Sequence, residues 1–251
     1  MKKYEPILNV PPIVVATLAA MVFVHVWRIY ALTPSENIDF LANFAFIPAR
    51  YDPSVAPSGL FPGGFGAEIW TFVTYAFIHA DWMHIAINGV WLLAFGSAVA
   101  RRFGPLRFLA LFAVTAAAGA AAHLLTHVGE MVVMVGASAA ISGFMAAAIR
   151  FAFQRGGPLS MWRAHDEAAY RVPAAPLMAA LRDPRILAFL AVWFGLNILF
   201  GLGSMAVPGV EQSIAWEAHI GGFVAGLLLF AVFDPHTTSR HPGQDGGETL
   251  Q

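Results

Sequence analysis

The stretch Val135-Gly136-Ala137-Ser138-Ala139-Ala140-Ile141-Ser142-Gly143 places one serine, Ser138, among glycine and alanine. No charged residue occurs from Met131 to Ile149, so the hydroxyl of Ser138 lies in an apolar segment where it needs a hydrogen-bond partner. Its small neighbours leave the oxygen uncovered and let other backbones approach closely. Similar stretches occur at ordinary contacts between membrane helices, so the rest of the chain must distinguish a reactive serine from a packing motif.

The composition indicates an all-α polytopic membrane protein. Of the 251 residues, 58% are hydrophobic and only 12% are charged, and the mean hydropathy is +0.66; these values are typical of chains that cross a bilayer repeatedly. The absence of cysteine excludes disulfides, thiolate metal sites and cysteine nucleophiles. A net charge of −1 argues against nucleic acid as a partner.

Six apolar segments predict six transmembrane helices in one membrane domain, residues 1–235, followed by a short disordered tail, residues 236–251. The fourth segment carries Ser138 and ends near Arg150–Arg155. The other five are Val10–Trp27, Trp82–Ala100, Phe108–Val128, Ile186–Val210 and Ala218–Phe233.

Lysine and arginine predict the orientation of the chain. The chain has 14 lysine and arginine residues. If it crosses the membrane six times, only Arg28 and Arg50 fall on the side that carries the long loop Thr33–Ile69. Because basic residues remain on the cytoplasmic side, both termini and the loop Gln154–Asp183 are expected in the cytoplasm and Thr33–Ile69 outside. The aromatic piece Ile38–Phe46 of that outer loop is expected to lie at the membrane interface.

The fourth helix is predicted to be short and buried. A helix from Ser138 to Phe153 rises only about 24 Å, less than the roughly 30 Å of the hydrocarbon core. Glu130–Ala137 would therefore enter the membrane as irregular chain, which is tolerated only where protein or water surrounds it.

Imidazole and amide side chains inside membrane segments are rare and are functional candidates. His84 and Asn88 are four residues apart and share one helix face, with His79 just before them. His219 is near the outer start of the sixth segment, so the predicted topology places it in the outer part of the membrane, at a depth similar to that of His84 and Ser138. The alternative is that each group is satisfied separately by its own backbone or by interfacial water.

The spacing of Gly222 and Gly226 allows the sixth helix to pack closely on a neighbour. If that neighbour is the fourth helix, His219 comes within reach of Ser138. An imidazole beside a serine hydroxyl is the arrangement of a nucleophile and its general base.

The developing oxyanion would need fixed donors, which the amide of Asn88, the ring of His84 and the backbone N–H of Ser138 can supply. No acidic third member is evident, because Glu217 lies two residues before His219 and faces away from it. We therefore expect a Ser–His dyad. No histidine cluster has a carboxylate or thiolate to complete it, so no metal and no cofactor are expected.

Three motifs resemble those of the rhomboid intramembrane serine proteases, in their basic six-span bacterial form: His79-Ala80-Asp81-Trp82-Met83-His84-Ile85-Ala86-Ile87-Asn88, Gly136-Ala137-Ser138, and Ala218-His219-Ile220-Gly221-Gly222-Phe223-Val224-Ala225-Gly226. The resemblance covers about Glu68–Phe233. It implies that Ser138 is the nucleophile and His219 the base. It also implies that His84 and Asn88 belong to the oxyanion site, and that His79 and Gly136 support the structure.

The resemblance further implies substrates that are single-span membrane proteins, cleaved in or near their membrane segment within the inner (plasma) membrane. These substrates would pass the fifth helix, Ile186–Leu202, under a cap near Gly203–Ser213. The alternative is a non-catalytic rhomboid-like protein that binds client transmembrane helices.

Three positions depart from the family pattern. Ala139 stands where glycine usually follows the nucleophile, and its methyl group could crowd the oxyanion site. Thr71 stands where an arginine usually follows a tryptophan, which leaves the anchoring of the first loop open. Ser142 replaces an aromatic side chain that braces the base in some members, so His219 is expected to be held less firmly.

Overall fold

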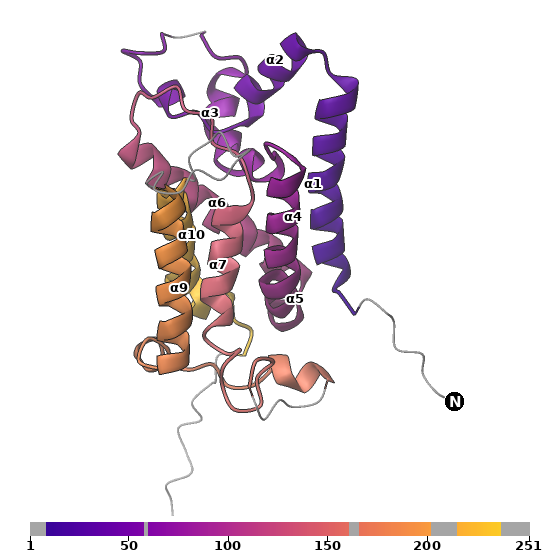
Figure 1. Cartoon of the computed structure of the whole chain (residues 1–251), viewed down its shortest axis with the longest axis vertical. Coiled ribbons are helices and arrows are strands. Elements are labelled where there is room, and N and C mark those ends of the chain that lie inside the picture. Colours follow the sequence, from indigo (N-terminus) through magenta and orange to yellow (C-terminus); the bar gives the residue numbers. More distant parts are fainter. Residues whose placement is uncertain (1–8, 58–59, 161–165, 202–214, 237–251) are drawn as a thin grey trace, which may run out of the picture.

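The structure is a computed structural model that describes residues 9–57, 60–160, 166–201 and 215–236, and Figure 1 shows their arrangement. These residues are helical or irregular, apart from one isolated bridge between Phe46 and Met134. Among them, four helical stretches are long and apolar enough to cross a membrane: α1 (Pro12–Ala31), α4 to α5 (Trp82–Phe103), α6 (Pro105–Thr126) and α10 (Trp216–Phe233). The chain is therefore a multi-pass helical membrane protein.

Two further apolar helices are shorter, α7 (Ser138–Ala148) and α9 (Pro184–Gly201). They fall on the fourth and fifth predicted segments, and the count of six spans stays a prediction. The helix α7 begins at Ser138 as expected, but it ends at Ala148 and gives way to turns, not at Phe153. The expected cap at Gly203–Ser213, and the end of the fifth segment, lie outside the described residues.

The second span is continuous but not uniform. The helix α4 (Trp82–Trp91) passes through a π-helical turn, Leu92–Gly96, into α5 (Ser97–Phe103). Asp81 caps the start of α4, since its carboxylate accepts a hydrogen bond from the backbone N–H of His84 at 2.7 Å. This cap fixes where α4 begins, and so places His84 in its first turn and Asn88 one turn later.

The helices α6, α7 and α10 form the tightest part of the bundle. A Cβ added to Gly222 would overlap the backbone of Ala139, and one added to Gly226 would overlap the backbone of Gly143. A Cβ on Gly119 of α6 would lie 2.5 Å from the methyl carbon of Ala139. The helix α10 therefore packs on α7, backbone against backbone, which meets the condition under which His219 was expected to reach Ser138.

The long loop between the first two spans is more ordered than the sequence indicated. It contains α2 (Pro34–Phe44), which begins with a reciprocal capping box between Thr33 and Glu36. The hydrogen bonds from Thr33 hold the pKa of the Glu36 carboxyl below its ordinary value. The same loop leads into α3 (Gly64–Thr74), a helix that was not predicted from the sequence.

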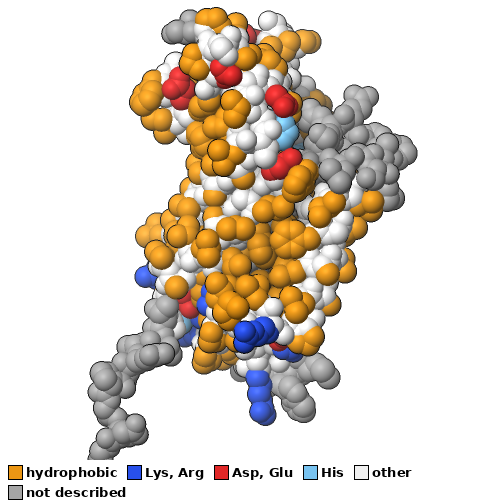
Figure 2. Space-filling view, turned by 90° about the vertical axis from the view of Figure 1, so that its left-hand side faces the viewer, with side chains coloured by type: hydrophobic (Ala, Val, Ile, Leu, Met, Phe, Trp, Pro, Cys, Tyr) orange, Lys and Arg blue, Asp and Glu red, His pale blue; other side chains and the backbone are white. Residues whose placement is uncertain are grey.

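The two ends of the bundle differ in charge. In Figure 1, α2 and α3 lie at one end, and the segment after α7, which includes α8 (Leu177–Ala180), lies at the other. Figure 2 shows a hydrophobic middle, with arginine side chains at that second end and acidic side chains at the first. The start of α1 belongs to the basic end, because Arg101 donates a hydrogen bond to the side chain of Asn9 at 2.8 Å.

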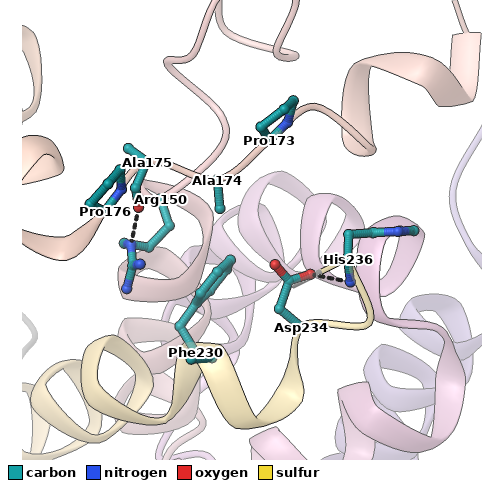
Figure 3. A pocket seen from close by; sticks show the side chains of 9 residues that line it. Arg150, Pro173, Ala174, Ala175, Pro176, Phe230, Asp234 and His236 are labelled. Carbon is teal, nitrogen blue, oxygen red and sulfur yellow. Dashed lines mark hydrogen bonds between the residues drawn. The ribbon is translucent and has the colours of Figure 1, made fainter. Parts of the chain in front are cut away.

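A buried ion pair closes the basic end. Arg102 donates two hydrogen bonds to the carboxylate of Asp234, at 3.0 and 2.8 Å, and two more to the carbonyls of Tyr170 and Val172. Beside it lies a cavity of about 260 Å³ (Figure 3), lined in part by Arg150, whose Nε donates to the carbonyl of Ala175. Because Arg150 follows the last turn of α7, this cavity is at the opposite end of that helix from Ser138.

Candidate functional site

The chain enters the site as the predicted irregular segment, Glu130–Ala137. Its backbone is satisfied by protein: Phe46 and Met134 exchange two hydrogen bonds, and Ala49 N–H donates to the carbonyl of Glu130. Irregular backbone at membrane depth requires such partners. The segment therefore delivers Ser138 to the first turn of α7 from a fixed direction.

Ser138 and His219 are brought together by the contact between α7 and α10. The Nε2 of His219 lies 2.6 Å from the Oγ of Ser138, within hydrogen-bond distance. Both residues are half-buried. The pair has the geometry in which an imidazole can take the proton of a serine hydroxyl.

Gly136 is required both by its backbone and by the space around it. Its φ is +116°, a conformation that side-chain-bearing residues rarely adopt. A Cβ at this position would also lie 2.6 Å from Nε2 of His84. The ring of His84 thus lies directly over the segment that leads into Ser138.

Asn88 lies one turn below His84 on α4 and is 3% exposed. Its Nδ2 donates to the carbonyl of His84 at 2.9 Å, which fixes the orientation of the amide. The amide has a second N–H, which does not take part in this hydrogen bond. His84 and Asn88 therefore share one face of α4, as predicted, with the His84 ring beside the α7 start.

His79 is fully buried, and its ring packs edge-on against that of His84, with ring centroids 5.0 Å apart. Its backbone carbonyl accepts two hydrogen bonds from α1, from Arg28 at 2.8 Å and from His25 at 3.2 Å. These two partners were not predicted from the sequence. The sequence signal for them is that both are polar side chains near the end of the first apolar segment, where such side chains are rare.

Asn197 is a further site residue that was not predicted from the sequence. It lies on α9, and its Oδ1 is hydrogen-bonded to Nδ1 of His219. Its Nδ2 donates to the carbonyl of Trp193, one turn earlier on the same helix, at 2.8 Å. An amide inside the apolar run Ile186–Val210 carried the same signal as Asn88 and could have been found by it.

The structure accounts for two of the three departures from the family pattern. The methyl group of Ala139 is 1% exposed and packs toward Gly119 of α6. The Oγ of Ser142 donates to the carbonyl of Ser138 at 2.7 Å, so it supports the first turn of α7 and does not contact the base. The base is held from α9 by Asn197 instead.

The third departure concerns the first loop, which Arg50 anchors. Its guanidinium donates to the carbonyls of Pro62 and Ala42 and lies over the ring of Phe61. Thr71, at the family's arginine position, pairs instead with the hydroxyl of Tyr51 at 2.8 Å.

One cluster in the described part of the chain has metal-ligand chemistry: His123, His127 and Glu217, whose candidate ligand atoms lie within 4.8 Å of one another. The approach of Glu217 to these histidines was not predicted from the sequence. The two rings are stacked, however, with centroids 4.1 Å apart and planes 28° apart. A zinc ion about 2 Å from each nitrogen must lie near both ring planes, which stacked rings do not allow without rotation.

These features define a class: a multi-pass membrane protein in which a serine on the short helix α7 and a histidine on the longer helix α10 lie within hydrogen-bond distance. The sequence model of the Rhomboid domain matches residues 66–235, more than half of the chain. The chain belongs to the rhomboid family.

Individual relatives are more distant. RHOMBOID-like protein 1 of Arabidopsis thaliana is 26% identical over 205 residues, which are 77% of this chain and 44% of the relative. RHOMBOID-like protein 6, mitochondrial, of the same plant is 26% identical over 234 residues, 87% of this chain and 66% of the relative. Rhomboid protease GlpG of Haemophilus influenzae is 31% identical over 51 residues, 20% of this chain and 27% of that protein. The chain spans less than half the length of the first of these relatives.

Proposed function

We propose that this protein is an intramembrane serine endopeptidase that cleaves single-span membrane proteins in or near their membrane segment. The observation that carries the proposal is the 2.6 Å separation between Nε2 of His219 and Oγ of Ser138. Membership of a family that includes a protein named rhomboid protease GlpG supports it.

The proposed reaction is acyl transfer followed by hydrolysis. Ser138 Oγ attacks the carbonyl carbon of the substrate peptide bond while Nε2 of His219 accepts the hydroxyl proton. The protonated imidazole then donates that proton to the leaving amine. Water then attacks the acyl-enzyme while His219 accepts a proton from it. His219 returns a proton to the departing Ser138 oxygen, which regenerates the serine hydroxyl.

The oxyanion donors are proposed to lie around the first turn of α7. The backbone N–H of Ser138 is one of the unpaired donors at a helix start. The ring of His84 lies over Gly136, and the amide of Asn88 is oriented by its bond to the His84 carbonyl. Together they would stabilise the charge that develops on the substrate carbonyl oxygen.

We further propose that residues 1–235 form one six-span domain and that both termini are cytoplasmic in an inner (plasma) membrane. The basic end of the molecule, which holds the start of α1 and the segment after α7, supports this orientation. Ser138 and His219, at the opposite ends of α7 and α10 from it, would then lie in the outer part of the membrane.

A serine-reactive fluorophosphonate tests the proposal against the alternative of a non-catalytic protein that binds client helices. Labelling requires an activated hydroxyl, so the purified protein should be labelled and Ser138→Ala should not. Cleavage of a reconstituted single-span substrate should follow the same pattern. Absence of both labelling and cleavage in the unaltered protein would favour the client-binding alternative.

A further inference from the structure

The base of the proposed dyad has a second hydrogen-bond partner besides Ser138. Asn197 of α9 meets the ring nitrogen of His219 that faces away from Ser138. Neither the three sequence motifs nor the expectation of a Ser–His pair without a third member includes this residue.

The hydrogen bonds of Asn197 determine which way its amide points. Nδ2 donates to the carbonyl of Trp193 at 2.8 Å. If the amide were reversed, Oδ1 would face that carbonyl, and two acceptors would be opposed. Oδ1 is therefore the atom directed at His219.

An amide oxygen can only accept, so Nδ1 of His219 must carry the proton in this bond. In a neutral imidazole the other nitrogen then has the free lone pair. That nitrogen is Nε2, which lies 2.6 Å from the Ser138 hydroxyl. Asn197 thus selects the one neutral tautomer that can accept the serine proton.

We propose that Asn197 is a positioning residue that sets the tautomer and orientation of His219, an inference that rests on the proposed protease function for its catalytic consequence. Its role corresponds to that of the residue that orients the histidine in a catalytic triad, with a neutral amide in place of a carboxylate.

The placement of Asn197 also ties the base to α9. That helix contacts α10 through Trp193 and Phe194, whose rings lie 5.2 and 5.6 Å from that of Phe223. Several of its other side chains are exposed, among them Leu187, Val192, Leu196 and Ile198. The bond between Asn197 and His219 can exist only while α9 remains packed against α10.

The test compares Asn197→Leu, which keeps the size of the side chain but removes the acceptor, with Asn197→Asp, which keeps an acceptor at the same place. Leu106→Ala, an exposed position at the basic end of α6, is the matched control. The first readout is the ¹⁵N spectrum of histidine-labelled protein, with the His219 signals assigned by their loss in His219→Gln. The second is the rate of cleavage of a single-span substrate.

In the unaltered protein, His219 should be protonated at Nδ1 and not at Nε2. Asn197→Leu should mix the tautomers and lower kcat about 10- to 100-fold with KM unchanged, less than the ~10⁴ loss when a triad carboxylate is replaced. Asn197→Asp should restore the tautomer and most of the rate, and Leu106→Ala should match the unaltered protein.

An unchanged His219 spectrum in Asn197→Leu would overturn the inference, as would equal rate losses in Asn197→Leu and Asn197→Asp. The spectrum does not depend on proteolysis. A protein that cleaves and labels nothing, yet shows the Asn197-dependent tautomer, would refute the proposed function and leave the positioning role standing.

Discussion

The carbonyl of Ala139 occupies the space that a side chain on Gly222 would need. This close approach sets the separation of α7 and α10, and with it the distance between Ser138 and His219. The reactive pair therefore depends on the absence of a side chain one turn along from the base.

Gly222→Ala should destabilise the protein, because the new methyl group overlaps backbone that cannot move without separating the two helices. Overpacking of this kind costs typically 1–3 kcal/mol. Thermal unfolding in detergent should show the loss, with a parallel loss of fluorophosphonate labelling. Gly195→Ala on α9 is the matched control, since a Cβ there meets no atom within 4 Å. Equal unfolding temperatures for the two variants would contradict the packing argument.

Ser138→Ala should reduce cleavage to background, because no other hydroxyl is within hydrogen-bond distance of His219 among the described residues. His219→Ala should do nearly the same, since it removes the base. Initial rates with a reconstituted single-span substrate check both. Cleavage by Ser138→Ala at the unaltered rate would refute the assignment of the nucleophile.

Asn88→Ala should leave slow but measurable cleavage, because several donors share the developing negative charge. Loss of one oxyanion donor typically costs about 10²–10³ in kcat, and substrate binding should change less. His84→Ala should behave similarly and should also lower stability, since His79 packs against that ring. The double variant Ser138→Ala/Asn88→Ala should be no slower than Ser138→Ala alone. An Asn88→Ala rate equal to that of the unaltered protein would remove Asn88 from the oxyanion site.

Asp234→Asn should destabilise the basic end of the bundle, because it leaves the fully buried guanidinium of Arg102 without its counter-charge. Breaking one side of a buried pair costs about 3–5 kcal/mol. Asp183→Asn is the control: Asp183 pairs with the exposed side chain of Arg185, and a surface pair contributes about 0–1 kcal/mol. Denaturation in detergent should separate the two variants, and similar small losses would show that the buried pair is not needed.

A reporter that is active only outside the cytoplasm should work when inserted in the loop 33–69 and fail when fused after Asp234. The prediction rests on the placement of Arg28 and Arg50 apart from all other basic residues. Strong activity of the C-terminal fusion would reverse the proposed orientation.

Much of the fold could be predicted because its signals are local. Hydropathy located the apolar segments, and the starts of α4 at Trp82 and α7 at Ser138 coincide with the predicted positions. The glycine spacing on α10 predicted a close helix contact. The predicted end of α7 at Phe153 was wrong: the helix ends at Ala148, two residues before Arg150, whose Nε donates to the carbonyl of Ala175 in the segment that follows.

The sequence by itself determined the class of the protein, the polar residues inside its membrane segments and the family motifs. Only the tertiary structure determined which residues meet: Asn197 with His219, Arg28 with the carbonyl of His79, and Arg102 with Asp234, 132 residues apart. The physical reason is that helices apolar on all sides have no polar face to indicate their rotation. Their partners are chosen by close packing and by the few polar groups that must find one another.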